Sequence, residues 1–280
     1  MIQTFSTSRV VRRVTSAFQV TALLLASGLI LQSPQIALAQ AKKGGSTKAT
    51  EPAAQSNWSA IDAAFLDLNP EKALELTTAA LKTQPQNQDL LWRHSRALVG
   101  TADRMKDKSK QLATYEQAKS VAEQVIVANP QNMYGYLRRA IAAGKIALFK
   151  GVLETRELVL LTRNDAQKAI ELNNAGTYEL GLAHYLLGRV HLKLSETPKV
   201  MRMPLGLGWG TVQEAETHLS KAVATFPDSP GFHVDYAKAL MKLEKTSQAK
   251  EELQKATSLK PLDASDVERI QEAKDLLKSM

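Results

Sequence analysis

The chain has 280 residues, of which 44% are hydrophobic, enough for one or two domains or for one elongated repeat array. It contains no cysteine, which excludes a disulfide framework, a thiolate metal site and a cysteine nucleophile. Six basic residues and no acidic residue lie in residues 1–50, so only +2 of the formal net charge of +8 falls on the rest of the chain. A nucleic-acid-binding domain concentrates basic residues on its folded surface, and this distribution therefore argues against nucleic acid as a partner.

Residues 1–39 have the layout of a secretory signal peptide. A positive region at residues 9–13 precedes the apolar run "FQVTALLLASGLIL" (Phe18–Leu31), and small residues follow that allow cleavage after Ala39. A transmembrane helix needs about 20 apolar residues, and this run is shorter. We expect a periplasmic or secreted protein without a transmembrane span in the mature chain. Import into an organelle is the alternative, and a retained anchor is the weaker one.

Residues 40–56, "QAKKGGSTKATEPAAQS", are small, polar and interrupted by Gly and Pro. This composition is typical of a flexible linker. Folded structure should begin near Trp58, and we assign one helical repeat domain to residues 57–280.

The repeat domain shows a helical pattern throughout. Its apolar residues recur at i, i+3, i+4 and i+7, and no run of alternating β-branched residues competes, so the fold class is all-α. Four segments place small or apolar residues at relative positions 0, 4 and 7 and a proline at position 12: Lys72–Pro85, Gln117–Pro130, Glu214–Pro227 and Gln248–Pro261. A fifth, degenerate copy around Asp165–Asn174 has Asn in place of the proline.

The spacing of these copies identifies the type of repeat. Pro227 and Pro261 are 34 residues apart, which is the tetratricopeptide period. Small residues let the second helix of each pair approach its neighbour, and pairs stack because one pair cannot bury its apolar face alone. The 45-residue spacing from Pro85 to Pro130 predicts longer helices or larger turns in the middle. We predict a tetratricopeptide-like right-handed α-solenoid of about five helix pairs, near residues 58–83, 88–128, 132–173, 177–226 and 231–259, with a C-terminal capping helix at 263–279.

The fourth pair contains an insert at residues 196–210. The helix after it should begin at Thr211, with Glu214 three residues later as in a capping box. The insert is apolar and rich in glycine, and insertions in repeat proteins often map to the binding face. It could dock on the solenoid's own core, cover the groove as a lid, or offer an apolar patch to a partner or a lipid. The residues that would make such contacts are Met201, Arg202, Met203, Leu205, Leu207 and Trp209.

Several segments carry a family resemblance: "DLLWRHSRALV" (Asp89–Val99), "YEQAKSVAEQVI" (Tyr115–Ile126), "YLRRAIAAGKIALFKG" (Tyr136–Gly151) and "DAQKAIELNNAGTYELGLAHYLLGRVH" (Asp165–His191). In this order they resemble the regulator of microtubule dynamics family over Ala60–Pro261, with this chain as an exported bacterial-type relative. The more specific positions are Trp92, Arg93, Arg96, Ala97, Gly144, Lys150 and Gly151. The family name implies microtubule association in animal cells, and some relatives resemble organelle-contact proteins with lipid-accommodating cavities. For this chain the resemblance implies a solenoid with long middle helices and a binding role, without catalytic residues.

The sequence offers little support for an enzyme or a metalloprotein. His184 and His191 are seven residues apart, about 10 Å along a helix axis, too far for an i, i+4 metal pair without a third element. "PLGLGWG" (Pro204–Gly210) has neither the Walker nor the dinucleotide spacing. We therefore expect no enzymatic activity and no cofactor.

Arginines and a tyrosine on the first helices of two adjacent repeats are the candidate groove residues: Arg93, Arg96, Tyr134, Arg138 and Arg139. First helices line the concave face of such a solenoid, where guanidinium groups could hold acidic peptide termini or phosphate groups. The alternative is ion pairing with Asp89, Asp103 or Glu123. We expect a non-catalytic scaffold that binds a protein or peptide segment in this groove. A carrier of lipid or a small apolar ligand, with the insert as lid, is the second hypothesis.

Overall fold

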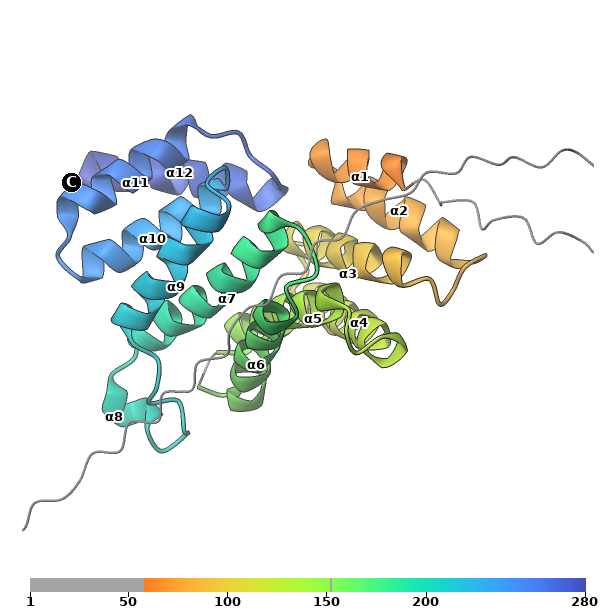
Figure 1. Cartoon of the computed structure of the whole chain (residues 1–280), viewed down its shortest axis with the longest axis horizontal. Helices are drawn as coiled ribbons and strands as arrows, with labels where there is room; N and C mark the ends of the chain where they lie inside the picture. Colours follow the sequence, from red (N-terminus) through yellow and green to blue (C-terminus); the bar gives the residue numbers. More distant parts are fainter. Residues whose placement is uncertain (1–57, 152) are drawn as a thin grey trace, which may run out of the picture. The chain divides into compact units, whose positions relative to one another are not determined.

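The computed structural model describes residues 58–151 and 153–280, which form α-helices joined by short connections (Figure 1). The predicted signal peptide and linker lie outside the described residues. The helices are α1 (Ser59–Leu66), α2 (Pro70–Leu81), α3 (Gln88–Asp103), α4 (Lys108–Ala128), α5 (Met133–Lys150), α6 (Arg156–Leu172), α7 (Thr177–Ser195), α8 (Lys199–Arg202), α9 (Val212–Thr225), α10 (Pro230–Lys242), α11 (Thr246–Ser258) and α12 (Ala264–Ser279).

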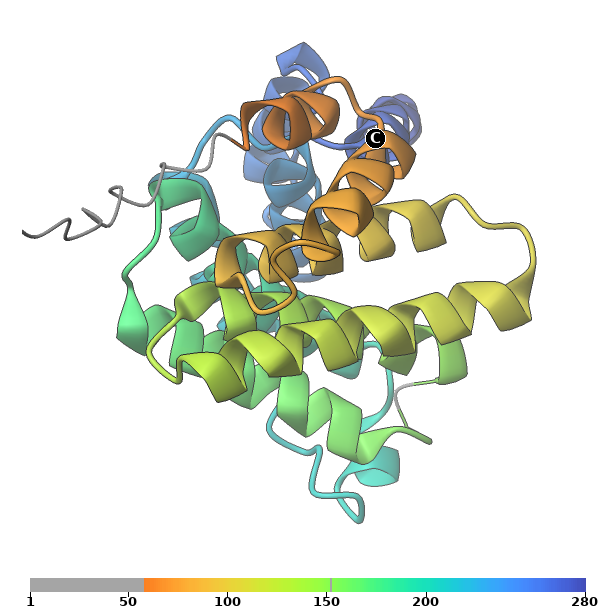
Figure 2. The same cartoon turned by 90° about the vertical axis from the view of Figure 1, so that its right-hand side faces the viewer.

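The helices form the predicted pairs. α1 packs on α2, α3 on α4, α5 on α6, α7 on α9 and α10 on α11, and each second helix also packs on the first helix of the next pair. Figure 2 shows α3 and α4 side by side with opposite chain directions. α12 packs on α10 and α11 as the capping helix. The predicted tetratricopeptide-like solenoid is confirmed.

The middle helices are long, which explains the wide proline spacing. α4 has 21 residues and α7 has 19, whereas α10 and α11 have 13 each. Predicted helix starts are also confirmed. Thr211 Oγ1 accepts a hydrogen bond from the Glu214 backbone N–H at 3.2 Å, and Asp263 caps α12 in the same way.

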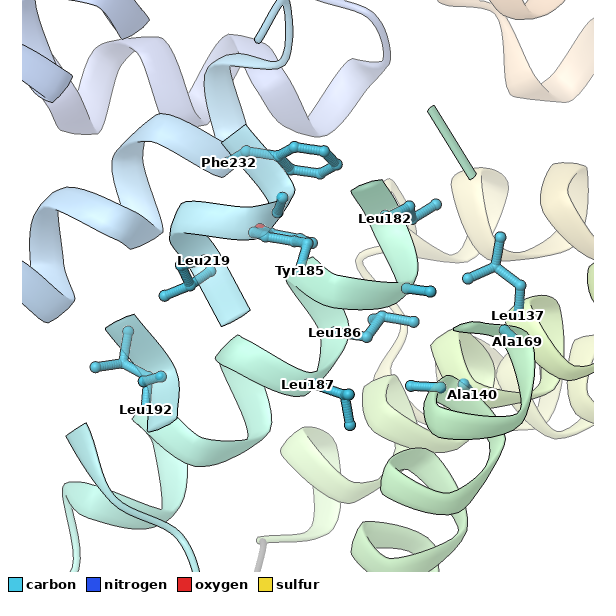
Figure 3. Packing of buried hydrophobic residues seen from close by; sticks show 14 of the residues in the cluster. Leu137, Ala140, Ala169, Leu182, Tyr185, Leu186, Leu187, Leu192, Leu219 and Phe232 are labelled. Atoms are coloured by element: carbon cyan, nitrogen blue, oxygen red, sulfur yellow. The ribbon is translucent and has the colours of Figure 1, made fainter. Parts of the chain in front are cut away.

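Small residues occupy the tightest helix contacts. The alanine at relative position 0 is fully buried in all five copies of the pattern: Ala73, Ala118, Ala166, Ala215 and Ala249. Gly188 of α7 lies so close to α9 that a Cβ atom built on it would be 2.5 Å from Leu219 Cγ. Figure 3 shows side chains of α5, α6, α9 and α10 meeting around α7 in the largest part of the core. Small residues thus let the helix backbones approach closely, and larger side chains fill the core between them.

No helix within residues 58–151 and 153–280 combines the length and the apolar character that crossing a bilayer requires.

Candidate functional site

Two adjoining cavities lie along the first helices of the pairs. The larger, of about 250 Å³, is lined mainly by α5, α6, α7, α10 and α12. The smaller, of about 150 Å³, is lined by α3, α5, α7, the α1–α2 corner and the start of α12. Both share Ile141 and Lys145 of α5 and Leu186 and Arg189 of α7. We call the two together the groove.

Two guanidinium groups in the smaller cavity have no ionic partner among the described residues. Arg138 is only 5% exposed, and its Nε and Nη2 atoms are buried without a hydrogen-bond partner there. Its Cζ lies 5.5 Å from the centre of the Trp92 ring. Arg96 likewise forms no ion pair in this part of the chain, and its Cζ lies 4.1 Å from the Phe65 ring centre. Burial, and secondarily the charge of Arg96, lower the pKa of Arg138 to about 10, which leaves it protonated at neutral pH.

The neighbouring arginines on the same two helices are paired. Arg93 donates from Nε to Asp62 Oδ1 at 2.8 Å and from Nη2 to Asp62 Oδ2 at 2.9 Å. Arg139 makes the equivalent two-bond contact with Asp165, at 2.7 and 2.8 Å. Neither arginine lines either cavity. The five predicted groove residues therefore separate into two kinds, those that face the smaller cavity and those that hold helices together.

The fifth of these residues, Tyr134, packs against an aromatic ring of α3. Its ring stacks on Trp92 with 4.3 Å between ring centres and an interplanar angle of 10°. Trp92 in turn lies beneath Arg93, whose Cζ is 4.2 Å from the ring centre. Tyr134 lines neither cavity, and its contact with Trp92 is a packing contact between α3 and α5.

The ion pairs that form are not those the sequence suggested. Arg93 binds Asp62, which lies 31 residues earlier in the chain. Arg139 binds Asp165, which lies 26 residues later. Neither forms an ion pair with Asp89, Asp103 or Glu123. Asp103 binds Lys145 instead, at 2.7 Å from Nζ to either oxygen. Only the packing of successive helices brings these groups together.

A buried carboxylate organises one end of the larger cavity. Asp235 of α10 is 3% exposed and accepts a hydrogen bond from the Tyr185 hydroxyl at 2.8 Å. Its oxygens also lie 3.1 Å from Arg189 Nε, 3.4 Å from Arg269 Nη1 and 3.4 Å from Lys238 Nζ. Burial alone would raise the pKa of Asp235, but the three cations outweigh it and hold the pKa below its ordinary value. This network, which no sequence pattern indicated, joins α7, α10 and α12.

The insert docks on α6 and α7. Leu207 is fully buried, and Arg202 is buried with Nη1 donating to the Leu207 carbonyl oxygen at 2.8 Å. The Trp209 ring lies edge-on to His191 and 4.4 Å from Arg163 Cζ. Leu205 packs on the same cluster, whereas Met201 and Met203 are exposed. Of the predicted insert, residues 196–210, only Glu196 lines a cavity, and this is the larger one.

A row of three histidines lies between α7 and α9. His184 and His218 place their Nδ1 atoms 3.2 Å apart, and the His191 and His218 ring centres are 5.9 Å apart. His191 Nδ1 accepts a hydrogen bond from the Thr211 backbone N–H. Burial and the neighbouring His218 lower the pKa of both His184 and His191 to about 4. The spacing of histidines along α7 did not indicate the contact with His218 of α9.

The described residues hold no group of three or more His, Asp or Glu side chains arranged to bind a metal ion. The rings of the histidine row pack at the α7–α9 contact, and their lowered pKa values keep them neutral at neutral pH.

Comparison with solved structures gives the fold. A thermophilic tetratricopeptide protein of Thermus thermophilus is similar with a TM-score of 0.50 and 18% identity, over 76% of this chain and 98% of that one. MamA from Desulfovibrio magneticus RS-1 is similar with a TM-score of 0.43 and 16% identity, over 71% of this chain and 90% of that one. No curated protein matches the chain with significance.

Sequence comparison gives the family. The family described as "Regulator of microtubule dynamics protein 1-3" matches residues 58–280, which include every described helix. The match covers the paired arginines, the unpaired arginines and the insert alike. The chain therefore belongs to the regulator of microtubule dynamics protein 1-3 family.

Proposed function

We propose that the chain is a non-catalytic scaffold whose groove binds an extended or helical segment of a partner protein. The observation that carries this proposal is the division of the groove into two small adjoining cavities. Sites for small molecules usually enclose about 300–1,000 Å³, and each cavity is below that range. Successive side chains of a peptide can each enter one of the two cavities.

The chemistry of the groove also supports a peptide. The larger cavity combines aliphatic side chains such as Val159 and Leu194 with the cations around Asp235. The smaller one combines aromatic rings with Arg96 and Arg138. Apolar surface supplies affinity, and charged groups fix orientation and register. Solenoids with a tetratricopeptide-like fold offer extended concave surfaces of this kind.

A carrier of lipid or a small apolar ligand is the second candidate, favoured by the aliphatic wall of the larger cavity. The insert would act as its lid only after moving, because residues 197–210 line neither cavity. We further propose that the protein acts in the periplasm or outside the cell after cleavage near Ala39, as the N-terminal sequence pattern indicates.

Site-specific photo-cross-linking tests the choice between protein and lipid. Leu148 lines the larger cavity and is 43% exposed, so a photoreactive residue fits there without disturbing the core. Val127 of α4, 83% exposed and away from both cavities, is the matched control. In cells that produce the full chain, we expect polypeptide adducts at position 148 and none at 127. Lipid adducts at 148 would favour the carrier, and equal adducts at both positions would contradict a groove site.

A further inference from the structure

We propose that Arg96 and Arg138 form a binding site for a single carboxylate group of the partner segment. This inference rests on the proposed function, since it names the chemical group that the smaller cavity recognises. α3 and α5 each carry one arginine paired with an aspartate and one arginine without an ionic partner in the described chain, and the unpaired arginine of each helix lines the smaller cavity.

Because Arg138 is buried, its lack of an ionic partner in the described chain is energetically unfavourable. Arg139, the next residue, shows what a structural arginine looks like here, because both of its bonds go to Asp165. A buried charge without a partner is strongly unfavourable, and a buried polar atom usually has a hydrogen-bond partner. Burying Arg138 therefore destabilises the fold, and no ion pair among the described residues compensates for it. Its donors are available for a bound anion.

Aromatic rings hold the two guanidinium groups in place. Trp92 supports Arg138 and Phe65 supports Arg96, each within the distance of a cation–π contact. These contacts limit the movement of both side chains. The Nε and Nη2 atoms of Arg138 have no hydrogen-bond partner among the described residues and can donate to a group bound beside them. Two arginines arranged in this way are preorganised for an oxyanion, because little side-chain freedom is lost on binding.

An acidic residue in the smaller cavity favours a carboxylate over a phosphate. Asp263, at the start of α12, lines this cavity of about 150 Å³. Asp263 accepts hydrogen bonds from the backbone of its own helix and is not within ion-pair distance of either arginine. Its negative charge disfavours a doubly charged phosphate more than a singly charged carboxylate. A planar carboxylate also matches the fork of a guanidinium group.

A peptide-retention experiment on the full chain tests the site. The probes are N-acetylated hexapeptide pools of mixed sequence: one without Asp or Glu and with a free C-terminus, the same pool amidated, and an amidated pool that contains Glu. Retained peptides are quantified by mass spectrometry, with inorganic phosphate as a competitor at constant ionic strength. We expect a pool with a carboxylate to be retained at least about tenfold better than the amidated pool without one, as for a hydrogen bond to a charged group. The first and third pools show whether the carboxylate is the terminus or a side chain.

The variants Arg138→Met and Arg96→Met should each abolish this preference. Lys119→Met, which removes a positive charge from α4 away from both cavities, should keep it. Arg138→Met should also raise the melting temperature of the free protein, whereas loss of a structural arginine would lower it. If Arg138→Met does not fold, Arg96→Met decides, because Arg96 is less buried.

Three results would overturn the carboxylate site: equal retention of free and amidated pools, a preference unchanged in Arg96→Met, or displacement of all pools by phosphate at low concentration. If the pools behave equally while position 148 still yields polypeptide adducts, only the carboxylate site fails. If the preference holds but position 148 yields lipid alone, the scaffold proposal fails and the anion site stands.

Discussion

Replacing Gly188 with alanine is a direct test of how closely the helix pairs pack. A Cβ at this position would be 2.5 Å from Leu219 Cγ, 2.9 Å from Leu219 Cδ2 and 3.2 Å from the Ala215 carbonyl oxygen. Since Ala215 O is backbone, relief requires α9 to move as well as Leu219. Overpacking of this kind costs about 1–3 kcal/mol, and the better helix propensity of alanine offsets roughly 1 kcal/mol. We therefore expect a net loss of up to about 2 kcal/mol of unfolding free energy.

Gly144→Ala is the matched control, since it makes the same change inside another long helix. The nearest atoms to its Cβ would be Thr162 Cγ2 at 3.5 Å and Oγ1 at 3.6 Å, which is ordinary contact. Only the propensity gain remains, and we expect stabilisation by about 0.5–1 kcal/mol. Urea denaturation followed by circular dichroism measures both changes. The close-packing argument would be refuted if Gly188→Ala were as stable as Gly144→Ala.

The remaining predictions concern the groove network, the histidine row and the insert. Asp235→Asn removes the negative charge that three cations share, so unfolding free energy should fall by about 3–5 kcal/mol in urea denaturation; a loss below that of an exposed ion pair would show that the network is dispensable. His184 and His191, with pKa values lowered to about 4, contribute stability that is present above the ordinary pKa of 6.5 and is lost as pH falls from there towards 4. In thermal melts between pH 6.5 and 4, the melting temperature of His184→Gln should fall less steeply with pH than that of the unchanged protein. An equal slope would exclude the histidine row as the cause of the pH dependence. Leu207→Ala should cost about 2–5 kcal/mol, because the side chain is fully buried. Met203→Ala, at a position 58% exposed, should stay within about 0.5 kcal/mol, and equal effects at both positions would contradict the docking of the insert.

The repeat architecture could be predicted because it depends on local patterns. Small residues at fixed spacing mark where backbones approach, and prolines mark where second helices end, so the buried Ala118 and Ala215 could be assigned in advance. The wide proline spacing between Pro85 and Pro130 predicted longer helices or larger turns, and the structure has the longer helices. These features repeat in register along the chain, and each copy supports the others.

The candidate site was harder to predict because its contacts join residues far apart in sequence. The arginines of α3 and α5 look equivalent in sequence, and only the stacked helices show that Arg139 meets Asp165 while Arg138 meets no acid at ion-pair distance in the described chain. Likewise His218 reaches its partners on α7 across the insert, 34 residues from His184. Spacing within one helix carries no information on such contacts.

Hydrogen–deuterium exchange on the full chain, with and without the polypeptide recovered from cross-linking at position 148, tests the central claim most directly. A segment bound in the groove should slow exchange in the first helices α3, α5 and α7, which line both cavities or the smaller one. The outer helix α4 should be unchanged. Slower exchange confined to α4, α9 or residues 199–210, with α5 and α7 unaffected, would place the partner outside the groove and contradict the account.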